Sequence, residues 1–586
     1  MKELIKKRKV LIFVILLSIL STTLVVIPYP PMKPVKIPID DYTYAIEYTK
    51  YQLNKLQKKH NLPSYGVSLI NGNETIYQNA VGMSNIESGV EANLQTVFRA
   101  GSISKVFTAV EIMRLYEEGL VDLDAPIETY LPDFSINSRF NDSDPITIRN
   151  ILAHRSGLPR NGNIPLWAWD NETYILRDLV ASLEESYVAF PANYRFKYSN
   201  IGYNILGRII EVVRGELFAF RLRDSLLRPI RMNSSGFLSQ DTPAQAQIAM
   251  GYYKDGKNNI PYNQYDLITL ASGNLYTTLD DMNAFARFIF NEGNVNGNQI
   301  LNETTLSLMF ESQYSSSRDP QQIGAGFFVD NHLLPENEQI VFHAGTCDGT
   351  GSIFAVIPEQ QLGVVLYANS EEFVDPCKTL ALEILEIMYE TKTGLKKQKT
   401  DYEYQEVDTT ILQNHIGLYS IGSEIIEVYQ TSSGNLKLIY QGSKMDLKPL
   451  NESTFVASHW LLDVGDVKVS FVEDYLILSI EDVAFITCPS YQVDQELLSN
   501  WSSSLGNYET WMRHYSVYTD TEIPGTVTLQ IENNVLSLDW QNFILQPISQ
   551  TELIIIGGPF DGETMELDSD TGFIYWQNIV FKPVVE

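Results

Sequence analysis

The sequence predicts an α+β fold, in which helices flank an antiparallel sheet, followed by a C-terminal all-β, barrel-like region. Between residues 43 and 396, strand patterns occur at both ends and helical patterns between them, which is typical of a sheet completed by distant segments. Between residues 401 and 586, short β-like runs alternate with turn residues. Hydrophobic residues make up 44% of the 586 residues and charged residues 19%, so the chain can build a large core.

The N-terminal segment differs from the rest of the chain. Residues 1–9 contain five basic side chains and form a predicted cytoplasmic tail, whereas residues 10–27 carry no charge. A basic flank before an apolar run favours a membrane anchor. A cleaved signal peptide is the alternative, although no small-x-small cleavage site follows the run. Residues 28–42 are rich in proline and are expected to form a linker, which places the rest of the chain outside the cytoplasm.

The overall charge argues against a nucleic-acid partner. The formal net charge is −30, with 72 acidic against 42 basic residues, and phosphate binding would need basic patches. The seven histidines form no HExxH or similar cluster, so neither a catalytic metal nor another cofactor is predicted. Cys347, Cys377 and Cys488 lie in no CxxC motif, which leaves open only that one pair forms a disulfide.

The first half of the α+β region contains two helix patterns and a hairpin pattern. Residues 41–60 are typical of an amphipathic helix. Residues 65–82 predict two strands joined at Asn71-Gly72, because Asn-Gly is the strongest short hairpin signal. Residues 106–120 have apolar side chains at helical spacing, and Gly119 predicts the end of that helix.

The second half of the region supplies the other elements of the predicted sheet. Residues 279–293 begin with acidic side chains and end in glycine, as a helix does. Residues 351–369 are typical of a hairpin, and residues 377–392 of a last helix. The two hairpins, far apart in the sequence, are expected to join in one sheet.

The C-terminal region, residues 401–586, contains a weak internal repeat. The segment that begins HIGLYSI resembles the later segment that begins SLGNYETW. Three pairs match: Gly417 with Gly506, Tyr419 with Tyr508, and Pro449 with Pro547. The repeat predicts two related β-rich halves; the alternative is two unrelated β-runs that share turn residues.

The stretch GSISK places Ser102 and Lys105 three residues apart at the start of a predicted helix. Three residues are almost one helical turn, so both side chains lie on one face. Serine is also a common helix cap, because its oxygen accepts from free backbone N–H groups. The S-x-x-K spacing alone therefore fits either a nucleophile with its base or an ordinary helix start.

Two further motifs follow in order: Tyr198-Ser199-Asn200 before an apolar helix pattern, and His343-Ala344-Gly345 before the second hairpin. The sequence S-x-x-K, Y-x-N and basic-x-Gly resembles the serine β-lactamase and penicillin-binding superfamily. Tyrosine in the second motif resembles its class C β-lactamase branch, which includes D-Ala-D-Ala carboxypeptidases, D-aminopeptidases and esterases. The stretches ILAHRSGLP (151–159) and ASGNLYTTLDDM (271–282) resemble signatures of the same branch.

The resemblance covers residues 43–396 and implies a β-lactamase/transpeptidase-like domain with a defined set of site residues. It implies that Ser102 is the nucleophile and Lys105 its base, since a serine hydroxyl needs a base to become reactive. Tyr198 would share the proton and pass it to the leaving group. Asn200 would orient Lys105 and bind a substrate amide.

The resemblance also implies an oxyanion hole and a substrate-binding strand. The oxyanion donors would be the backbone N–H groups of Ser102 and Thr346, beside Gly345. His343 stands where dedicated β-lactamases of this branch carry lysine, so we expect a weaker, pH-dependent anchor for a substrate carboxylate. A packed strand histidine is the alternative for His343. We expect His154 to shape its loop rather than to react.

These expectations combine into an exported serine hydrolase that works through an acyl-enzyme. The expected substrates are small peptides or amides of the D-amino-acid type, or esters, with β-lactam hydrolysis as a secondary activity. The alternative is a non-catalytic sensor or envelope-binding protein that keeps the fold. The sequence predicts neither the lining of the substrate pocket nor the oligomeric state.

Overall fold

A computed structural model describes residues 30–163, 176–243, 247–314, 320–398, 401–458, 467–480, 484–492, 494–514, 519–577 and 579–584. The expected cytoplasmic tail and apolar segment, residues 1–27, lie outside the described residues. Among the helices that are described, none is both long and apolar enough to cross a membrane. Residues 30–42 lie along the last helix of the α+β domain, where Lys33 pairs with Glu390 at 2.7 Å and Asp40 N–H donates to Thr391 O at 3.1 Å.

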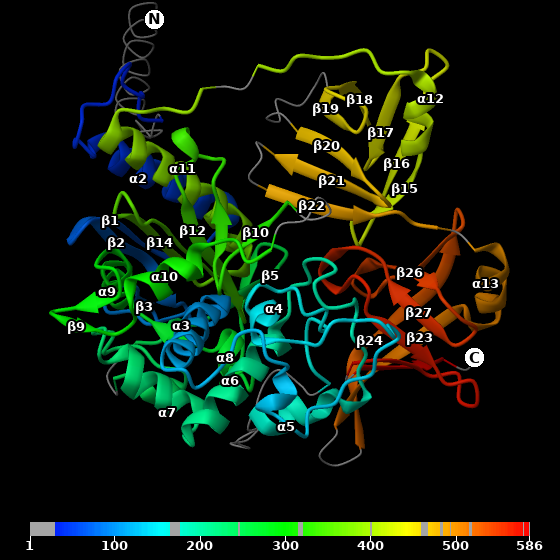
Figure 1. The fold of residues 1–586 in the computed structure, drawn as a ribbon, viewed down its shortest axis with the longest axis horizontal. Helices are drawn as coiled ribbons and strands as arrows, with labels where there is room; N and C mark the ends of the chain where they lie inside the picture. The colour runs from blue at the N-terminus through cyan, green and yellow to red at the C-terminus, as the bar shows by residue number, and fades with distance from the viewer. Residues whose placement is uncertain are drawn as a thin grey trace, which may run out of the picture.

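An antiparallel eight-stranded sheet forms the centre of the α+β domain (Figure 1). Its strand order is β10-β11-β12-β13-β14-β1-β2-β3. The strands are β1 Ser64–Asn71, β2 Glu74–Asn85, β3 Val90–Glu91, β10 Gln322–Ile323, β11 Phe328–Asp330, β12 Ile340–Cys347, β13 Thr350–Ile357 and β14 Leu362–Ala368. β1 pairs with β14, with Leu69 opposite Val364, which confirms that the two predicted hairpins join in one sheet.

Helices cover both faces of this sheet. On one face lie α2 (Thr43–His60) and α11 (Val374–Thr393), as Figure 1 shows. On the other lie α3 (Ser104–Glu117), α6 (Asn200–Arg214) and α9 (Leu279–Phe290). Alternate residues of β13 enter the two cores, with Ile353 toward α11 and Phe354 toward α9, as strand geometry requires.

Short elements complete the α+β domain. The short helices are α4 Ile148–Leu152, α5 Leu176–Ala181, α7 Phe218–Leu222, α8 Leu270–Gly273 and α10 Glu303–Phe310. The short strand pairs are β4 Phe98–Arg99 with β7 Tyr276–Thr277, β5 Tyr252–Asp255 with β6 Asn258–Pro261, and β8 Asn294–Val295 with β9 Asn298–Gln299. Cys347, Cys377 and Cys488 are all buried and free, so the disulfide that the sequence left open is not formed.

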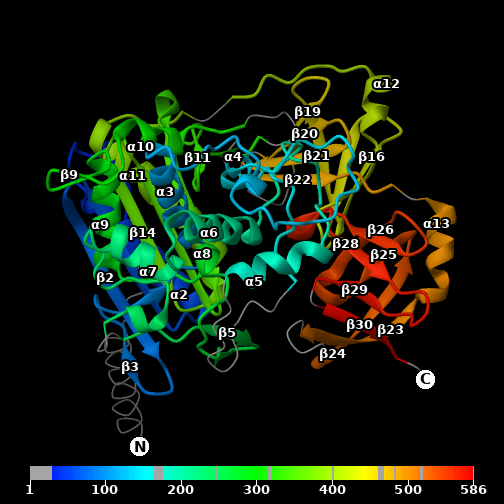
Figure 2. The ribbon, with the colours of Figure 1, turned by 60° about the horizontal axis from the view of Figure 1, so that its bottom comes forward.

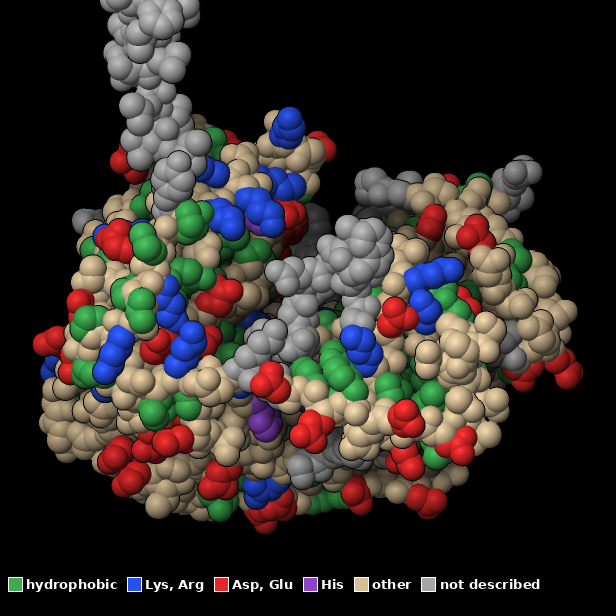
Figure 3. All heavy atoms as spheres, turned by 90° about the horizontal axis from the view of Figure 1, so that it is seen from above, with side chains coloured by type: hydrophobic (Ala, Val, Ile, Leu, Met, Phe, Trp, Pro, Cys, Tyr) green, Lys and Arg blue, Asp and Glu red, His purple; other side chains and the backbone are tan. Residues whose placement is uncertain are grey.

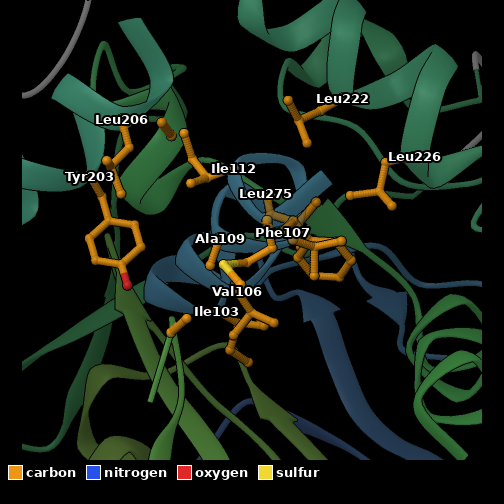
Figure 4. Close-up of a cluster of buried hydrophobic side chains, with 14 of the residues drawn as sticks. Ile103, Val106, Phe107, Ala109, Ile112, Tyr203, Leu206, Leu222, Leu226 and Leu275 are labelled. Atoms are coloured by element: carbon orange, nitrogen blue, oxygen red, sulfur yellow. The ribbon is translucent and has the colours of Figure 1, made fainter. Parts of the chain in front are cut away.

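Helix α3 is surrounded by apolar side chains, as Figure 4 shows for Phe107 and Ile112. Tyr203 and Leu206 of α6 pack on one side of it, and Leu222 of α7 lies on another (Figure 4). A helix that is apolar on most of its surface belongs in a core. This packing fixes the N-terminal end of α3, which carries the S-x-x-K motif.

The C-terminal region consists of two consecutive eight-stranded antiparallel units (Figures 1 and 2). The first follows α12 (Thr409–Leu412) and contains β15 Gly417–Ser420, β16 Ile425–Gln430, β17 Leu436–Tyr440, β18 Ser443–Pro449, β19 Thr454–Ser458, β20 Val467–Val472, β21 Tyr475–Ile480 and β22 Ala484–Pro489. The second follows α13 (Gln495–Asn500) and is a closed barrel of β23 Gly506–His514, β24 Thr519–Glu532, β25 Val535–Leu538, β26 Phe543–Pro547, β27 Glu552–Ile555, β28 Thr564–Leu567, β29 Ile574–Trp576 and β30 Ile579–Pro583.

The residues of the sequence repeat occupy matching places in the two units. Gly417 and Gly506 each begin the first strand, while Pro449 and Pro547 each end the fourth. In both units the matched tyrosine hydroxyl, of Tyr419 or Tyr508, donates to the backbone carbonyl four residues earlier. The repeat therefore reflects the same strand arrangement and the same turn at the start of each unit.

The barrel also lies against the α+β domain. Figure 2 shows α5 beside the barrel strands β28 and β29. Residues on both sides line a cavity of about 500 Å³, among them Glu185 and Tyr187 from one unit and Glu566 and Trp576 from the other. Acidic side chains are spread over the face shown in Figure 3, with basic side chains among them.

Candidate active site

Ser102 lies in a tight turn that leads into α3. The turn spans Gly101–Ile103, and Ser102 is partly exposed between two buried neighbours. Gly101 has a φ of +54°, and a Cβ there would lie 2.5 Å from the carbonyl oxygen of Thr346. Only glycine fits this position, so the turn presents Ser102 where strand β12 passes closest to it.

Lys105 lies one turn after Ser102 and is completely buried. Its Nζ is 3.1 Å from Ser102 Oγ, 2.8 Å from Asn200 Oδ1 and 2.7 Å from Ser272 O. Burial, together with the positive charge of Arg160, holds the pKa of Lys105 well below its usual value. The amine can therefore be neutral at physiological pH.

The hydrogen bonds of Lys105 leave its lone pair for Ser102. A neutral amine has two N–H groups and one lone pair. The carbonyl oxygens of Asn200 and Ser272 can only accept, so they use the two N–H groups. The lone pair then points to the third neighbour, the Ser102 hydroxyl, and is placed to take its proton.

Tyr198 and Asn200 complete the group around Ser102. The Tyr198 hydroxyl hydrogen-bonds Ser102, and burial raises the pKa of Tyr198 to about 12, so the phenol keeps its proton. Lys105 Nζ also lies 4.8 Å from the centre of the Tyr198 ring. Asn200 begins α6, which Ser199 caps by accepting Gly202 N–H at 3.0 Å. The Nδ2 of Asn200 donates to Asn161 Oδ1 at 2.9 Å, so one N–H of the Asn200 amide remains for a substrate.

The ring of His154 packs against the ring of Tyr198. The two ring centres are 4.3 Å apart, and His154 Nδ1 accepts Ser199 N–H at 3.1 Å. An accepting nitrogen is unprotonated, which agrees with burial holding the pKa of His154 well below its usual value. His154 also has a φ of +54°, so it shapes the loop as the sequence analysis expected.

Strand β12 brings a second backbone N–H beside that of Ser102. A Cβ on Gly345 would lie 2.0 Å from Ala100 O and 3.0 Å from the backbone nitrogen of Ser102. The strand therefore touches the Ser102 turn, and glycine at 345 permits the approach. Gly101 in turn approaches the backbone of Thr346, so the nitrogens of Ser102 and Thr346 lie at one place, as an oxyanion hole requires.

His343 lies on the same strand but is 2% exposed. Its ring packs edge-on against Phe328 at 5.4 Å and lies 6.4 Å from the ring of Tyr198. Nδ1 is 2.6 Å from Ala344 O, and because a carbonyl only accepts, Nδ1 carries the proton. Burial lowers the pKa of His343 to about 3, so the ring is neutral at physiological pH and supplies no cation to the site.

The C-terminal barrel borders the site through the loop between β27 and β28. Two ion pairs join that loop to the segment before Tyr198, and both are buried: Lys197–Glu563 at 2.9 Å and Arg195–Asp561 at 2.8 Å. The two cations alternate along the chain, so they point to the same side. The barrel is thereby fixed next to the Y-x-N motif.

A small cavity of about 210 Å³ opens beside Tyr198. Phe196 and Tyr198 line it from the α+β domain, whereas Ile421, Ile486 and Pro559 line it from the two C-terminal units. The ion-paired Arg195, Lys197 and Asp561 also line the cavity, and its apolar residues leave room for a small apolar group beside Tyr198.

The predicted residues gather at one place, and the structure adds others. Ser102, Lys105, Tyr198 and Asn200 are directly linked, and Gly345 and Thr346 adjoin the Ser102 turn. Four residues that contribute to the site were not predicted from the sequence: Asn161, Arg160, Ser272 and Glu563. Arg160 and Asn161 directly follow the signature at 151–159, and Ser272 lies within the signature at 271–282. In the described part of the chain, no cluster of three or more His, Cys, Asp or Glu residues could hold a metal.

The sequence model of the family described as Beta-lactamase matches residues 52–387, which is more than half of the chain. The chain belongs to the Beta-lactamase family. A relative of this β-lactamase-family chain, Protein flp of Staphylococcus aureus strain MRSA252, is 23% identical over 438 residues, which cover 74% of this chain and 82% of flp.

Solved structures agree with the β-lactamase fold. The octameric penicillin-binding protein homologue of Pyrococcus abyssi superposes with a TM-score of 0.53 at 22% identity, covering 74% of this chain and 98% of that one. A class C β-lactamase superposes with a TM-score of 0.50 at 21% identity, covering 61% and 98%. These similarities show the fold of the family and leave the substrate to be inferred from the site.

Proposed function

We propose that this chain is an exported serine hydrolase that forms an acyl-enzyme on Ser102. One observation carries the proposal: Nζ of the buried Lys105 lies 3.1 Å from Ser102 Oγ and within 2.8 Å of two carbonyl oxygens, so the neutral amine would direct its lone pair to Ser102. Burial lowers the pKa of Lys105, and its Nζ lies within reach of a partly exposed serine. General-base assistance of this kind contributes roughly 10²–10⁴-fold to a reaction rate.

Acylation then follows from the positions of the groups. Lys105 takes the proton of Ser102 as Oγ forms a bond to the substrate carbonyl carbon. The carbonyl oxygen gains negative charge and is stabilised by the N–H groups of Ser102 and Thr346. Tyr198 donates its proton to the leaving nitrogen or oxygen as that bond breaks, and regains a proton from Lys105. Water attacks the ester in the second half and releases the acid.

The proposed substrates are small amides or peptides of the D-amino-acid type, or esters. The 210 Å³ cavity beside Tyr198 supports a small apolar group. A neutral His343 supports an activity other than dedicated β-lactam hydrolysis, because it lacks the permanent cation that lysine would supply. Weak turnover of β-lactams follows as a secondary activity.

The sequence supports a location outside the cytoplasm with a single N-terminal membrane anchor, as part of the same proposal. The second candidate function is a non-catalytic sensor or envelope-binding protein. The two C-terminal units favour it in one respect, since they add a large surface beside the site. Only the hydrolase would turn over a substrate, so turnover distinguishes the two candidate functions.

A covalent probe separates the two functions. A fluorophosphonate and a fluorescent penicillin are incubated with the protein, and the modified peptide is identified by mass spectrometry. We expect an adduct on Ser102 that is absent from Ser102→Ala and kept in Ser88→Ala, an exposed serine outside the site. Turnover of p-nitrophenyl esters, D-amino-acid anilides and nitrocefin then ranks the substrates. A folded protein without any adduct would exclude the hydrolase.

A further inference from the structure

Arg160 is fixed at the edge of the candidate active site by its main chain. Its backbone N–H donates to Glu563 Oε1 of the barrel at 2.7 Å. Its carbonyl oxygen accepts the N–H of Asn200, the first residue of α6, at 2.7 Å. Arg160 thus joins the barrel loop to the Y-x-N motif, and its two backbone hydrogen bonds fix the main chain from which its side chain extends.

The guanidinium group of Arg160 lies close to two aromatic rings. It is 5.1 Å from the ring centre of Tyr198 and 5.6 Å from that of Phe560 on the barrel loop. Rings attract a cation through their faces but leave the N–H donors at the edge of the guanidinium free. Within the described ranges, no carboxylate or carbonyl receives a hydrogen bond from these donors.

The carboxylates near Arg160 already accept hydrogen bonds from other side chains. Glu563 accepts from Lys197 Nζ and from Gln577 Nε2, and Asp561 accepts from Arg195. Arg139 and Arg149, elsewhere on this side of the domain, pair with Glu552 and Asp124. Arg160 is partly exposed, so an anion can reach it, and in a chain with a net charge of −30 a cation next to Tyr198 is a place where one could bind.

The charge of Arg160 also acts on the catalytic groups. It contributes to the low pKa of Lys105 and opposes the raised pKa of Tyr198. His343, by contrast, is buried and neutral, so strand β12 offers a substrate anion no cation. The described cation with unused donors at this site is therefore Arg160, on the Tyr198 side.

We propose that Arg160 is a binding site for an anion and that the substrates of this site carry a carboxylate within its reach. The proposal rests on the hydrolase function proposed above and narrows its substrate class. A guanidinium matches a carboxylate with two parallel N–H···O bonds, which fixes the ligand in orientation as well as in place. The barrel takes part in this binding through Phe560, because the ring of Phe560 also lies within 5.6 Å of the guanidinium.

Binding to an inactive protein tests this separately from turnover. The full chain with Ser102→Ala is titrated by calorimetry with three stable anilides of similar size, in two of which a carboxylate replaces one neutral end group. Pentanoyl-p-nitroanilide is neutral, glutaryl-p-nitroanilide carries a carboxylate on the acyl side, and 4-(pentanoylamino)benzoate carries it on the amine side. We expect one anionic compound to bind roughly ten- to a hundredfold more tightly than the neutral one, as hydrogen bonds to charged groups allow.

Second substitutions in the same protein assign the preference to Arg160. Arg160→Gln is expected to abolish the preference, and Arg160→Lys to keep part of it. Arg228→Gln is the matched control, because it removes one exposed, ion-paired cation far from the site and is expected to change nothing. Equal binding of all three anilides, or a preference that survives Arg160→Gln, would overturn the proposal. If Arg160→Gln abolishes the anion preference but no fluorophosphonate labels the protein with Ser102 intact, the anion site is upheld and the hydrolase is excluded.

Discussion

Removing the Glu563 carboxylate should leave Lys197 as a buried cation without a counter-charge in contact, with the carbonyl oxygen of Pro559 still accepting from its Nζ at 3.1 Å. Both side chains are 3% exposed and 2.9 Å apart, so solvent does not screen their interaction. Breaking a buried pair by removing one partner costs about 3–5 kcal/mol. Burial already lowers the pKa of Lys197, and Glu563 opposes that shift, so the loss also favours a neutral Lys197. We therefore expect Glu563→Ala to lower the free energy of unfolding by about 3 kcal/mol or more, measured by urea denaturation at pH 7.

Two further variants test whether the burial of the Lys197–Glu563 pair accounts for the loss of stability. Glu552→Ala breaks a more exposed barrel pair, Arg139–Glu552, whose side chains are 24% and 29% exposed, and should cost only about 0–1 kcal/mol. The double variant Lys197→Met with Glu563→Leu should recover part of the loss, because an apolar pair can replace a buried ion pair, although Arg160 N–H and Gln577 Nε2 still lose their acceptor. Equal losses for Glu563→Ala and Glu552→Ala would refute the reasoning.

Three other predictions concern the site itself. Because Lys105 must be neutral to act and its pKa is lowered, labelling of Ser102 by a fluorophosphonate should rise with pH and level off well below pH 10; a rise that continues to pH 10 would contradict this. Gly345→Ala should reduce the labelling rate by roughly 10²-fold or more while circular dichroism stays native, because its Cβ would lie 2.0 Å from Ala100 O and displace the oxyanion donors. His343→Gln should leave the pH profile of labelling between pH 5 and 8 unchanged, since the ring is already neutral there, and a lost inflection near pH 6.5 would show otherwise.

The contact between Ser102 and Lys105 could be predicted from the sequence because it is local. Ser102 and Lys105 are one helical turn apart, and any helix at this place brings them together. Tyr198 and Gly345 were predictable by resemblance, since each lies in a short motif whose order is recognisable. The pairing of β1 with β14 followed from two hairpin patterns that needed a common sheet.

Other parts of the site have no local signal. Ser272 acts through its backbone carbonyl, which every residue has, so its side-chain type says nothing of its role. The bond between Arg160 and Glu563 joins residues 403 apart in the sequence, and only the docking of the barrel brings them together. The neutral state of His343 depends on burial by Phe328 and Tyr198, which the motif H-A-G does not encode.

The rate at which Ser102 is labelled without Lys105 tests the central claim most directly. Lys105→Met should slow labelling by roughly 10²–10⁴-fold, the usual contribution of a general base. Lys378→Met is the matched control, because Lys378 also has a pKa lowered by burial but lies on α11, on the opposite face of the sheet. We predict that Lys378→Met labels at the rate of the unaltered protein. Equal labelling rates for Lys105→Met and Lys378→Met would contradict the assignment of Lys105 as the base.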